Sequence, residues 1–326
     1  MLITRTPLRI SIGGGGTDLP SYYRERGGFL VAAAIKKYVY IAINRTFTDD
    51  YFLKYSAIER VPAVEEISHP ILRHALSLHQ VGPSLEIVSV ADIPAGTGLG
   101  SSGTFTVGLL RALHAFKREP VTQGDLAEEA CRIEIDHMGQ PIGKQDQYIA
   151  AFGGLTCFTF NPDDSVDVQR LDVSEETLRG LEAHLLLFFT GYSREAHVML
   201  NDQKVRSEAG DATMLRNLDR TKELGHEIKN ALEHGDTHLF GKLMHEHWQA
   251  KRARTPGMSN DQIDHWYSVA MANGATGGKL VGAGAGGFLM VYAEDPIRVR
   301  RALTEEGLTE VPFAFDHDGS TVLARD

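Results

Sequence analysis

Cysteine is scarce in this chain, with two residues, Cys131 and Cys157, among 326. Two cysteines are too few for a disulfide framework, and they do not have the spacing of a metal-binding cluster. We therefore expect both to be buried free thiols in a protein of a reducing compartment. The small secreted proteins that depend on disulfides are excluded.

Signals for export or membrane insertion are missing too. The N-terminus lacks the basic, apolar and small-residue pattern of a secretion signal, and no apolar run is long enough to span a membrane. Both absences predict a cytoplasmic protein without a membrane partner. Positive charge is in deficit, since 33 basic residues face 43 acidic ones for a formal net charge of −10. This balance disfavours a nucleic-acid binder, and a phosphorylated ligand would need local cations.

Glycine, by contrast, is abundant and clustered, with 33 residues. The most informative cluster is the run Pro94–Gly103, PAGTGLGSSG. Leu85–Val90 before it alternates as a half-buried strand would, and the apolar residues after it recur at helical spacing. A glycine-rich turn that leads into a helix leaves backbone N–H groups unpaired at the positive end of the helix dipole. Such a helix start is a suitable phosphate site.

Two more glycine-rich runs have the same character. Arg9–Asp18 (RISIGGGGTD) follows a short apolar strand, and Lys279–Phe288 (KLVGAGAGGF) precedes the apolar strand Phe288–Tyr292. A single glycine cluster is most often a tight turn. Three such runs, each beside an apolar strand, favour phosphate binding instead.

Two common nucleotide-binding motifs fit these runs poorly. Gly98–Gly103 matches G-x-G-x-x-G, but the residues from Ile93 to Thr97 separate it from its strand. The candidate acid, Asp125, lies at the expected start of a helix rather than at the end of a second strand. A P-loop requires Gly-Lys-Ser/Thr, whereas the chain has GKL at 278–280 and GKQ at 143–145.

The order and spacing of the three runs resemble the three motifs of the GHMP small-molecule kinases, which include galactokinase, homoserine kinase, mevalonate kinase and phosphomevalonate kinase. The matching segments are TPLR and GGGTD within 6–18, PxxxGLGSS at 94–102 and KLVGAGAGG at 279–287. Within the superfamily, RISIGGGGTDLPSYY at 9–23 resembles the branch that acts on D-glycero-D-manno-heptose 7-phosphate. The segment GKQDQYIAAFGG at 143–154 agrees with that branch.

The resemblance implies an α+β, two-domain GHMP kinase fold. Residues 1–175 would form an N-terminal ATP-binding domain like ribosomal protein S5 domain 2. Residues 176–326 would form a ferredoxin-like C-terminal domain, with nucleotide and sugar bound between the two. The polar stretch 165–179 is where we expect the boundary.

Local patterns predict the elements themselves. Helices are expected over 70–79, over 126–137 with a capping arrangement at Thr122 and Asp125, over most of 195–275, and over 296–306. His245 and His247 are two apart on a helix, so they cannot chelate one metal together, and we expect one in the core and one on the surface. Besides those already named, strands are expected over 29–35, 38–44, 154–160, 311–315 and 320–323.

Phosphoryl transfer needs a phosphate cradle and a divalent cation. Mg²⁺ takes hard oxygen ligands and keeps several waters, so one hydroxyl and one carboxylate suffice. The resemblance implies Ser102 and Glu134 as these ligands. A helix glutamate is more often solvated, and Glu128, Glu129 and Asp136 are nearby rivals. The nucleotide-binding residues expected in the central run are Pro94, Gly96, Thr97, Gly98, Leu99, Gly100, Ser101, Ser102 and Gly103.

The transfer also needs a group that accepts the proton of the acceptor hydroxyl. Asp146, in GKQDQY, is the expected catalytic base, since its Asp-Gln pair resembles that of galactokinase-type enzymes. Arg9 is the expected catalytic cation beside it, at the place of the basic residue in the first motif of related kinases. The alternative is that Asp146 caps a short helix and pairs with Arg9 at the surface.

The sugar is expected at the first glycine-rich run. Asp18 is suited to bidentate hydrogen bonding with hydroxyls, although an Asx turn is the alternative. Lys144, Arg194 and Lys204 are candidates for a distal phosphate of the substrate. The expected substrate-binding residues are Gly15, Gly16, Thr17, Asp18, Lys144, Arg194, Gly284 and Gly286.

These features lead to the hypothesis of an ATP- and Mg²⁺-dependent kinase, with the sugar implied by the resemblance. It would phosphorylate the C1 hydroxyl of heptose 7-phosphate to the 1,7-bisphosphate, for nucleotide-activated heptose and surface polysaccharide. A kinase for fucose or another free sugar and a non-catalytic sugar- and nucleotide-binding regulator are the alternatives. Asp146, Ser102 and Glu134 are all present, which favours an enzyme. Its partners would be ATP and a sugar phosphate, and a homodimer is left open.

Overall fold

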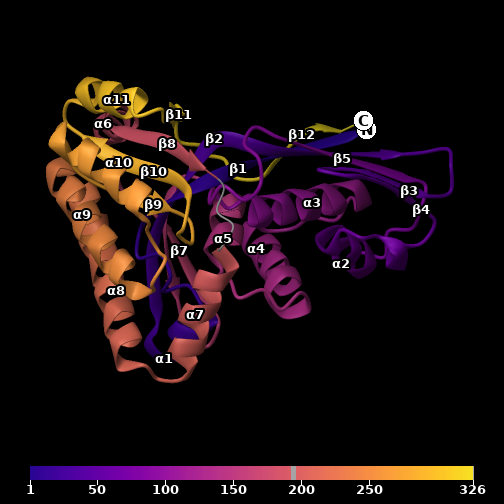
Figure 1. The fold of residues 1–326 in the computed structure, drawn as a ribbon. Helices are drawn as coiled ribbons and strands as arrows, with labels where there is room; N and C mark the ends of the chain where they lie inside the picture. The colour runs from indigo at the N-terminus through magenta and orange to yellow at the C-terminus, as the bar shows by residue number, and fades with distance from the viewer. Residues whose placement is uncertain (192–195, 326) are drawn as a thin grey trace.

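The computed structural model describes residues 1–191 and 196–325, which form two β-sheets flanked by helices (Figure 1). The first sheet has eight strands, in the order β12-β1-β2-β5-β3-β4, with β6 on β2 and β7 beside β6. Its pairs are antiparallel except β3 with β5. Its strands are β1 (Leu2–Gly13), β2 (Gly28–Arg45), β3 (Tyr51–Lys54), β4 (Ile58–Val61), β5 (Leu85–Ala91), β6 (Leu155–Phe160), β7 (Val166–Arg170) and β12 (Thr321–Arg325).

The second sheet is smaller and wholly antiparallel, in the order β11-β8-β10-β9. It is built from the C-terminal part of the chain, as the sequence predicts for the strand over 288–292. The prediction of an α+β fold with two domains is confirmed by this pair of sheets. The strands of the second sheet are β8 (Leu185–Gly191), β9 (Ala275–Val281), β10 (Gly287–Ala293) and β11 (Thr309–Glu310).

Helices α3 and α5 pack against the first sheet, α9 packs against β9, and α8 lies between α9 and the β1–β2 pair. In Figure 1 the first sheet and its helices run from indigo to magenta except β12, which is yellow, and the second sheet runs from rose at β8 to orange and yellow. The helices are α1 (Pro20–Arg26), α2 (Pro70–Leu78), α3 (Ser101–Lys117), α4 (Gln123–Cys131), α5 (Gln145–Phe152), α6 (Glu175–His184), α7 (Ala196–Glu208), α8 (Ala212–Glu233), α9 (Thr237–Arg254), α10 (Asp261–Ala272) and α11 (Pro296–Glu305), with a 3₁₀ turn, η1 (Val64–Glu66), and a π-helical turn, η2 (Arg132–His137).

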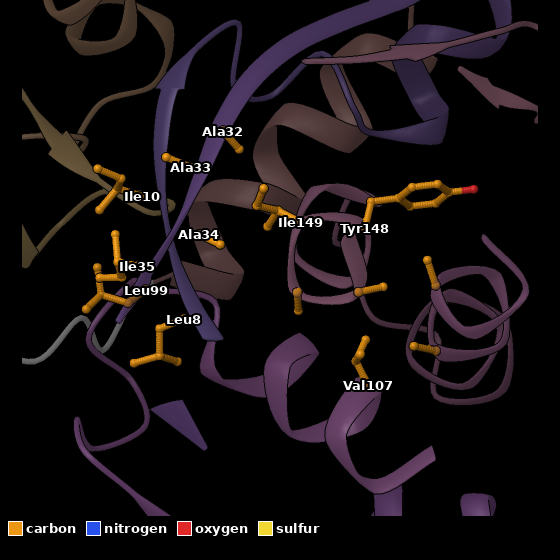
Figure 2. Packing of buried hydrophobic residues seen from close by; sticks show 14 of the residues in the cluster. Leu8, Ile10, Ala32, Ala33, Ala34, Ile35, Leu99, Val107, Tyr148 and Ile149 are labelled. Carbon is orange, nitrogen blue, oxygen red and sulfur yellow. The ribbon is translucent and has the colours of Figure 1, made fainter. Parts of the chain in front are cut away.

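The strands predicted over 29–35 and 38–44 are one long strand, β2. Its register with β1 shifts opposite Lys36 and Lys37, so the sequence break between them is an irregularity rather than a turn. The first part of β2 pairs with β6 and the second part with β5. The run Ala32–Ile35 is wholly buried, and Figure 2 shows Ala34 beside Ile149 of α5. The small alanine side chains allow this close helix approach.

The end of the chain returns to the first sheet, where β12 pairs with β1 and brings the two termini together (Figure 1). The predicted strand over 311–315 is wrong, since regular pairing there is limited to β11 and a single bridge between Ile35 and Phe315. The chain crosses between the sheets here: Val311 N bonds Leu187 O and Asp316 N bonds Ala34 O. The domain limits 1–175 and 176–326 stay a prediction, and β12 belongs with the first sheet.

The helix predicted over 126–137 begins as expected, because the Thr122 hydroxyl accepts a hydrogen bond from Asp125 N. Beyond Cys131, however, α4 continues as the π-helical turn η2. Such turns are rare and frequently occur at functional sites, because they re-aim side chains that a regular helix would point elsewhere. Glu134, the expected metal ligand, lies on this turn and is buried.

Cys131 and Cys157 are free and buried, as predicted. Across residues 1–191 and 196–325, none of the helices combines the length and the apolar character needed to cross a bilayer.

Glu129 of α4 bridges two histidines of neighbouring helices. Its carboxylate accepts from His114 Nε2 at 2.8 Å and lies 2.7 Å from His79 Nε2. Burial tends to raise the pKa of Glu129, but the bonds to His114 and His79 outweigh it and lower the pKa to about 2. Because the folded pKa is below the usual 4.5, the carboxylate stabilises the fold above about pH 4.5 and loses that effect as the pH falls towards 2.

Glu129→Gln is therefore expected to lower the free energy of unfolding by about 2 kcal/mol at neutral pH. Urea denaturation at pH 7 and at pH 3 measures the effect, and the difference from the parent protein should shrink at pH 3. Glu176→Gln is the matched control, because Glu176 is an exposed glutamate of α6, away from His79 and His114. A Glu129 variant as stable as this control at pH 7 would contradict the expectation.

Candidate active site

The central glycine-rich run leads from β5 into α3, as its sequence predicts. Gly96, Gly98 and Gly100 have φ values of +78°, +82° and +76°, which only glycine adopts readily. Gly100 is the N-cap of α3 and offers no side chain to the first turn of this 17-residue helix. The N–H groups of that turn, at the positive end of the helix dipole, are therefore available to an anion.

The three glycine-rich runs converge in space. A Cβ on Gly98 would lie 2.8 Å from Val281 O, and one on Gly282 would lie 2.7 Å from Gly98 Cα, so the second and third runs touch through their backbones. The first run joins them through Arg9, whose N–H bonds Leu99 O at 3.1 Å and whose Nη1 bonds Gly98 O at 2.6 Å. Segments some 270 residues apart thus form one site.

A cavity of about 240 Å³ lies where these runs meet. The second run contributes Gly96, Gly98, Gly100, Ser101 and Ser102 to its wall. Further wall residues come from the start of α5, from α7, and from α9 and β9 of the second sheet. The lining residues also include Arg9, Gly15, Gly16, Asp18, Asp146, His247, Lys251, Arg254, Lys279 and Gly282.

Asp146 and Arg9 form a bidentate ion pair at the cavity wall. Arg9 Nε donates to Oδ1 and Nη2 donates to Oδ2, both at 2.8 Å. The Arg9 side chain is only 6% exposed and that of Asp146 is 29% exposed, so the pair is not a surface pair. Gly103 of α3 permits this arrangement, because a Cβ there would lie 2.8 Å from Asp146 Cβ. The charge-paired carboxylate therefore lies beside the start of α3.

Ser102 and Glu134 meet on the same side. The Ser102 hydroxyl donates to Glu134 Oε1, and Gln147 Nε2 donates to Oε2 at 2.7 Å. Burial raises the pKa of Glu134, while these two hydrogen bonds act in the opposite direction. No basic side chain of residues 1–191 or 196–325 forms an ion pair with this carboxylate. A buried carboxylate with neutral partners beside a hydroxyl suits a hard cation.

Asp18 is buried between the first run and α5. Its Oδ1 accepts from Gly16 N at 3.0 Å and its Oδ2 from Gln145 N at 3.1 Å. Gly143 has no room for a side chain because a Cβ there would collide with this carboxylate. Burial, and next the nearby Asp146, raise the pKa of Asp18. The Asp18 side chain therefore both stabilises the local turn and lines the cavity.

Several predicted site residues lie elsewhere. Thr17 is wholly buried, and its hydroxyl bonds Gly14 O and Phe29 O, so it supports the turn instead of facing the cavity. Lys144 is turned away: its Nζ bonds both Glu128 oxygens, at 2.8 and 3.1 Å, and Asp164 O. In this structure Lys144 is therefore paired with a carboxylate and lies outside the cavity wall, and its contact with a substrate phosphate stays a prediction.

Other predicted site residues support the structure around the cavity. Thr97 and Leu99 are buried in the interior, and Leu99 joins the hydrophobic core shown in Figure 2. Gly284 packs against Met258, while Gly282 and Ala283 form the part of the third run that lines the cavity. The predicted residues outside the cavity wall are Pro94, Thr97, Leu99, Gly103, Thr17, Glu134, Lys144, Gly284 and Gly286; Lys204 lines a separate hollow, and Arg194 lies outside the described residues.

Sequence reasoning missed the basic side of the cavity. His247, Lys251 and Arg254 of α9 and Lys279 of β9 all line it, and each is at most 6% exposed. We call these four residues the basic wall. As predicted, His247 is in the core, and His245 is partly exposed and bonds the Tyr267 hydroxyl. The only local signal was the spacing of 247, 251 and 254, which lie on one helix face.

Comparison with known proteins gives consistent matches. Residues 64–154 match the family model for the GHMP kinases N terminal domain, and residues 228–308 match that for the GHMP kinases C terminal domain. The chain is 29% identical to the D-glycero-alpha-D-manno-heptose 7-phosphate kinase of Campylobacter jejuni, with 97% of each chain covered. It is 25% identical to the L-fucokinase/L-fucose-1-P guanylyltransferase of Bacteroides fragilis, over 92% of this chain and 36% of that one.

Among solved structures, one of a D-glycero-D-manno-heptose 1-phosphate kinase from Bacteroides thetaiotaomicron superposes with a TM-score of 0.83. It is 26% identical and fully covered in both directions. The two heptose relatives are named for different phosphate positions, 7 in one and 1 in the other.

Proposed function

The chain belongs to the GHMP kinases and is an ATP-dependent sugar kinase, and we propose that its acceptor is D-glycero-D-manno-heptose 7-phosphate. Phosphorylation of the C1 hydroxyl would give the 1,7-bisphosphate. The observation that carries the proposal is the Asp146–Arg9 pair, which lies on the wall of one cavity with the uncapped start of α3. Such a product would be an intermediate on the route to nucleotide-activated heptose for surface polysaccharide. Because the reaction consumes ATP, we expect the protein to act in the cytoplasm.

In the proposed reaction, backbone N–H groups from Gly98 to Ser102 bind the phosphates of ATP. The oxygen of the C1 hydroxyl forms a bond to the γ-phosphorus as the bond to the β,γ-bridging oxygen breaks, and ADP leaves. Asp146 accepts the hydroxyl proton, a role that suits a carboxylate within reach of solvent and substrate. Arg9 orients Asp146 through both guanidinium bonds and balances the charge that develops near Gly98.

Mg²⁺ is the cation that we propose for this site, with Ser102 and Glu134 as its protein ligands. The fit rests on a hydroxyl and a buried carboxylate that lacks an ion-pair partner within the described part of the chain. When bound, the ion would neutralise charge on the phosphate oxygens. Gln147, through its bond to Oε2, would hold the glutamate in place.

The sugar is proposed to lie against Asp18, Gly15 and Gly16. Each Asp18 oxygen accepts one backbone N–H and keeps a further acceptor site for a sugar hydroxyl. Because two backbone segments hold this carboxylate, its direction is set before the sugar arrives, which lowers the entropic cost of binding. The glycines leave the sugar room to approach the main chain.

The direct test is phosphoryl transfer from γ-labelled ATP to a panel of free and phosphorylated sugars. We expect transfer to heptose 7-phosphate, and a new ³¹P signal coupled to the anomeric proton would identify C1 as the site. A second candidate, a free sugar such as fucose, is favoured by the similarity to the L-fucokinase. Efficient labelling of fucose without labelling of heptose 7-phosphate would replace the proposal, and ATP binding without any transfer would point to the regulator.

A further inference from the structure

The basic wall concentrates positive charge inside a protein of net negative charge. Lys251, Arg254 and Lys279 are 6%, 4% and 1% exposed, and none of them forms an ion pair with a carboxylate within residues 1–191 or 196–325. Burying a cation without an anionic partner is costly, and basic residues are seldom fully buried unless paired. Three such side chains along one cavity wall indicate an anion that completes the site when it binds.

The hydrogen bonds of the wall hold the side chains in place and leave donors over. Lys279 Nζ bonds Ile12 O at 3.2 Å, and Lys251 Nζ bonds Leu280 O at 2.9 Å and Gly282 O at 2.5 Å. An ammonium has three N–H donors, so each lysine keeps capacity for a ligand. His247 Nε2 accepts from Gly14 N at 3.1 Å, while its buried Nδ1 has no partner in the described chain.

We propose that Lys251, Lys279 and Arg254 form a binding subsite for a phosphomonoester carried by the acceptor sugar, away from the hydroxyl that is phosphorylated. The proposal rests on the proposed function and deepens it. It replaces Lys144, whose ammonium is already paired, as the source of positive charge for a distal phosphate. It also makes the acceptor a sugar phosphate rather than a free sugar, because a neutral hydroxyl cannot offset buried cations.

The basic wall and the proposed nucleotide site lie on different elements and meet at the third glycine-rich run, where Lys251 Nζ bonds Gly282 O and Gly282 contacts Gly98. The nucleotide site is built by the start of α3, on the first sheet, whereas the basic wall belongs to α9 and β9, on the second sheet side. The first glycine-rich run lies between them: Arg254 Nη1 bonds Gly15 O at 3.3 Å, and Gly16 N bonds Asp18. A sugar held on this run would extend one end towards Asp146 and the other towards the basic wall.

Electrostatics support the same assignment. Burial, with Arg254 and Arg9 nearby, lowers the pKa of Lys279 to about 7. Burial and the neighbouring Lys279 and Arg254 lower the pKa of Lys251 well below its usual range. A phosphate dianion would favour the charged forms and raise both pKa values on binding.

The pKa of Lys279 sets the expected pH dependence of sugar-phosphate binding. The other charged or titratable groups lining this cavity are Arg9, Asp18, Asp146, His197 and His247. Deprotonation of Lys279 in the free enzyme weakens dianion binding, so the KM for the sugar phosphate should rise above about pH 7. The KM for the dephosphorylated sugar should stay flat over the same range.

The test compares a sugar phosphate with the same sugar lacking that phosphate, in the parent protein and in Lys279→Met and Lys251→Met. The parent should prefer the phosphorylated sugar in kcat/KM. Each variant should reduce this preference roughly tenfold to fiftyfold, the effect of losing one charge-assisted bond. The KM for ATP should change less than about twofold. Lys242→Met is the matched control, because Lys242 is an exposed lysine on the same helix, α9.

A structural role for the lysines would lower kcat/KM for both sugars equally, and that result would overturn the subsite. A rise in the KM for ATP with unchanged sugar preference would assign the cations to the nucleotide and overturn it too. Inorganic phosphate, added with saturating ADP and Mg²⁺ so that the start of α3 is occupied, provides a readout without turnover: it should raise the Tm of the parent and of Lys242→Met, but not that of Lys279→Met. If the parent phosphorylates no sugar phosphate, the proposed function fails, whereas equal phosphate stabilisation of all variants defeats the subsite alone.

Discussion

Replacing Asp146 with asparagine is expected to lower kcat by roughly 10³-fold while ATP still binds, because general-base catalysis typically contributes about 10²–10⁴-fold. Asparagine keeps the size of the side chain and one acceptor for Arg9, but its amide cannot take up the proton of the acceptor hydroxyl. The glycine-rich run from 94 to 103 should keep its shape, since Arg9 also bonds Gly98 O and Leu99 O. Steady-state kinetics and nucleotide titration measure the two effects separately.

Asp172→Asn is the control for this variant, because Asp172 is an exposed carboxylate away from the cavity. It should retain parental kcat. Near-parental turnover in Asp146→Asn would remove the assignment of the base. A loss of ATP affinity as large as the loss of kcat would instead make Asp146 a structural partner of Arg9.

Glu134→Gln is expected to lower kcat/KM by roughly 10²–10³-fold at a fixed Mg²⁺ concentration, since a metal contributes several kcal/mol of charge stabilisation. Its stability should not fall in parallel, because the change removes a buried charge. Burial raises the pKa of Glu134, so in the parent protein Mg²⁺ affinity should weaken as the pH drops towards that pKa. Calorimetric titration of Mg²⁺ into the ADP complex, with thermal unfolding alongside, measures both.

The control lies two residues further along η2. Asp136 is exposed and was a rival metal ligand on sequence grounds, so Asp136→Asn should keep parental Mg²⁺ affinity. If Asp136→Asn loses the metal and Glu134→Gln does not, the ligand assignment moves to Asp136. If Glu134→Gln loses stability and activity to the same extent, the role of Glu134 is structural, through its bonds to Ser102 and Gln147.

The parts of the site that lie within short stretches of sequence could be predicted. The helix start after Gly100 follows from local glycine conformation and the apolar spacing of α3, and the Thr122 cap follows from its own neighbours. The strand predicted over 311–315 is wrong because this segment crosses from one sheet to the other, with Val311 bonded to Leu187 and Asp316 to Ala34, and the local pattern does not show such a crossing. The continuity of β2 could not be predicted either, because pairing with β1 carries the strand across Lys36 and Lys37, where the sequence pattern breaks.

The lysines show why the substrate side of the site could not be predicted. Lys144 stands in a motif and looked available, yet Glu128, sixteen residues earlier, neutralises it. Lys251 has no sequence signal that sets it apart from other helix lysines, yet packing of α9 against β9 buries it beside Lys279. Whether a lysine is paired, exposed or desolvated depends on neighbours from distant segments, and no property of the residue itself reports it.

The amino-acid sequence by itself determined the three glycine-rich turns, the start of α3 and the identities of the groups that can carry the chemistry. Backbone preferences and side-chain acidity act over a few residues, so they can be read along the chain. Only the tertiary structure decided which charges meet: Arg9 with Asp146, Lys144 with Glu128, and the basic wall with no ion-pair partner among residues 1–191 and 196–325. Desolvation and charge pairing arise when segments that are not adjacent in the sequence exclude water together, and folding alone brings those segments into contact.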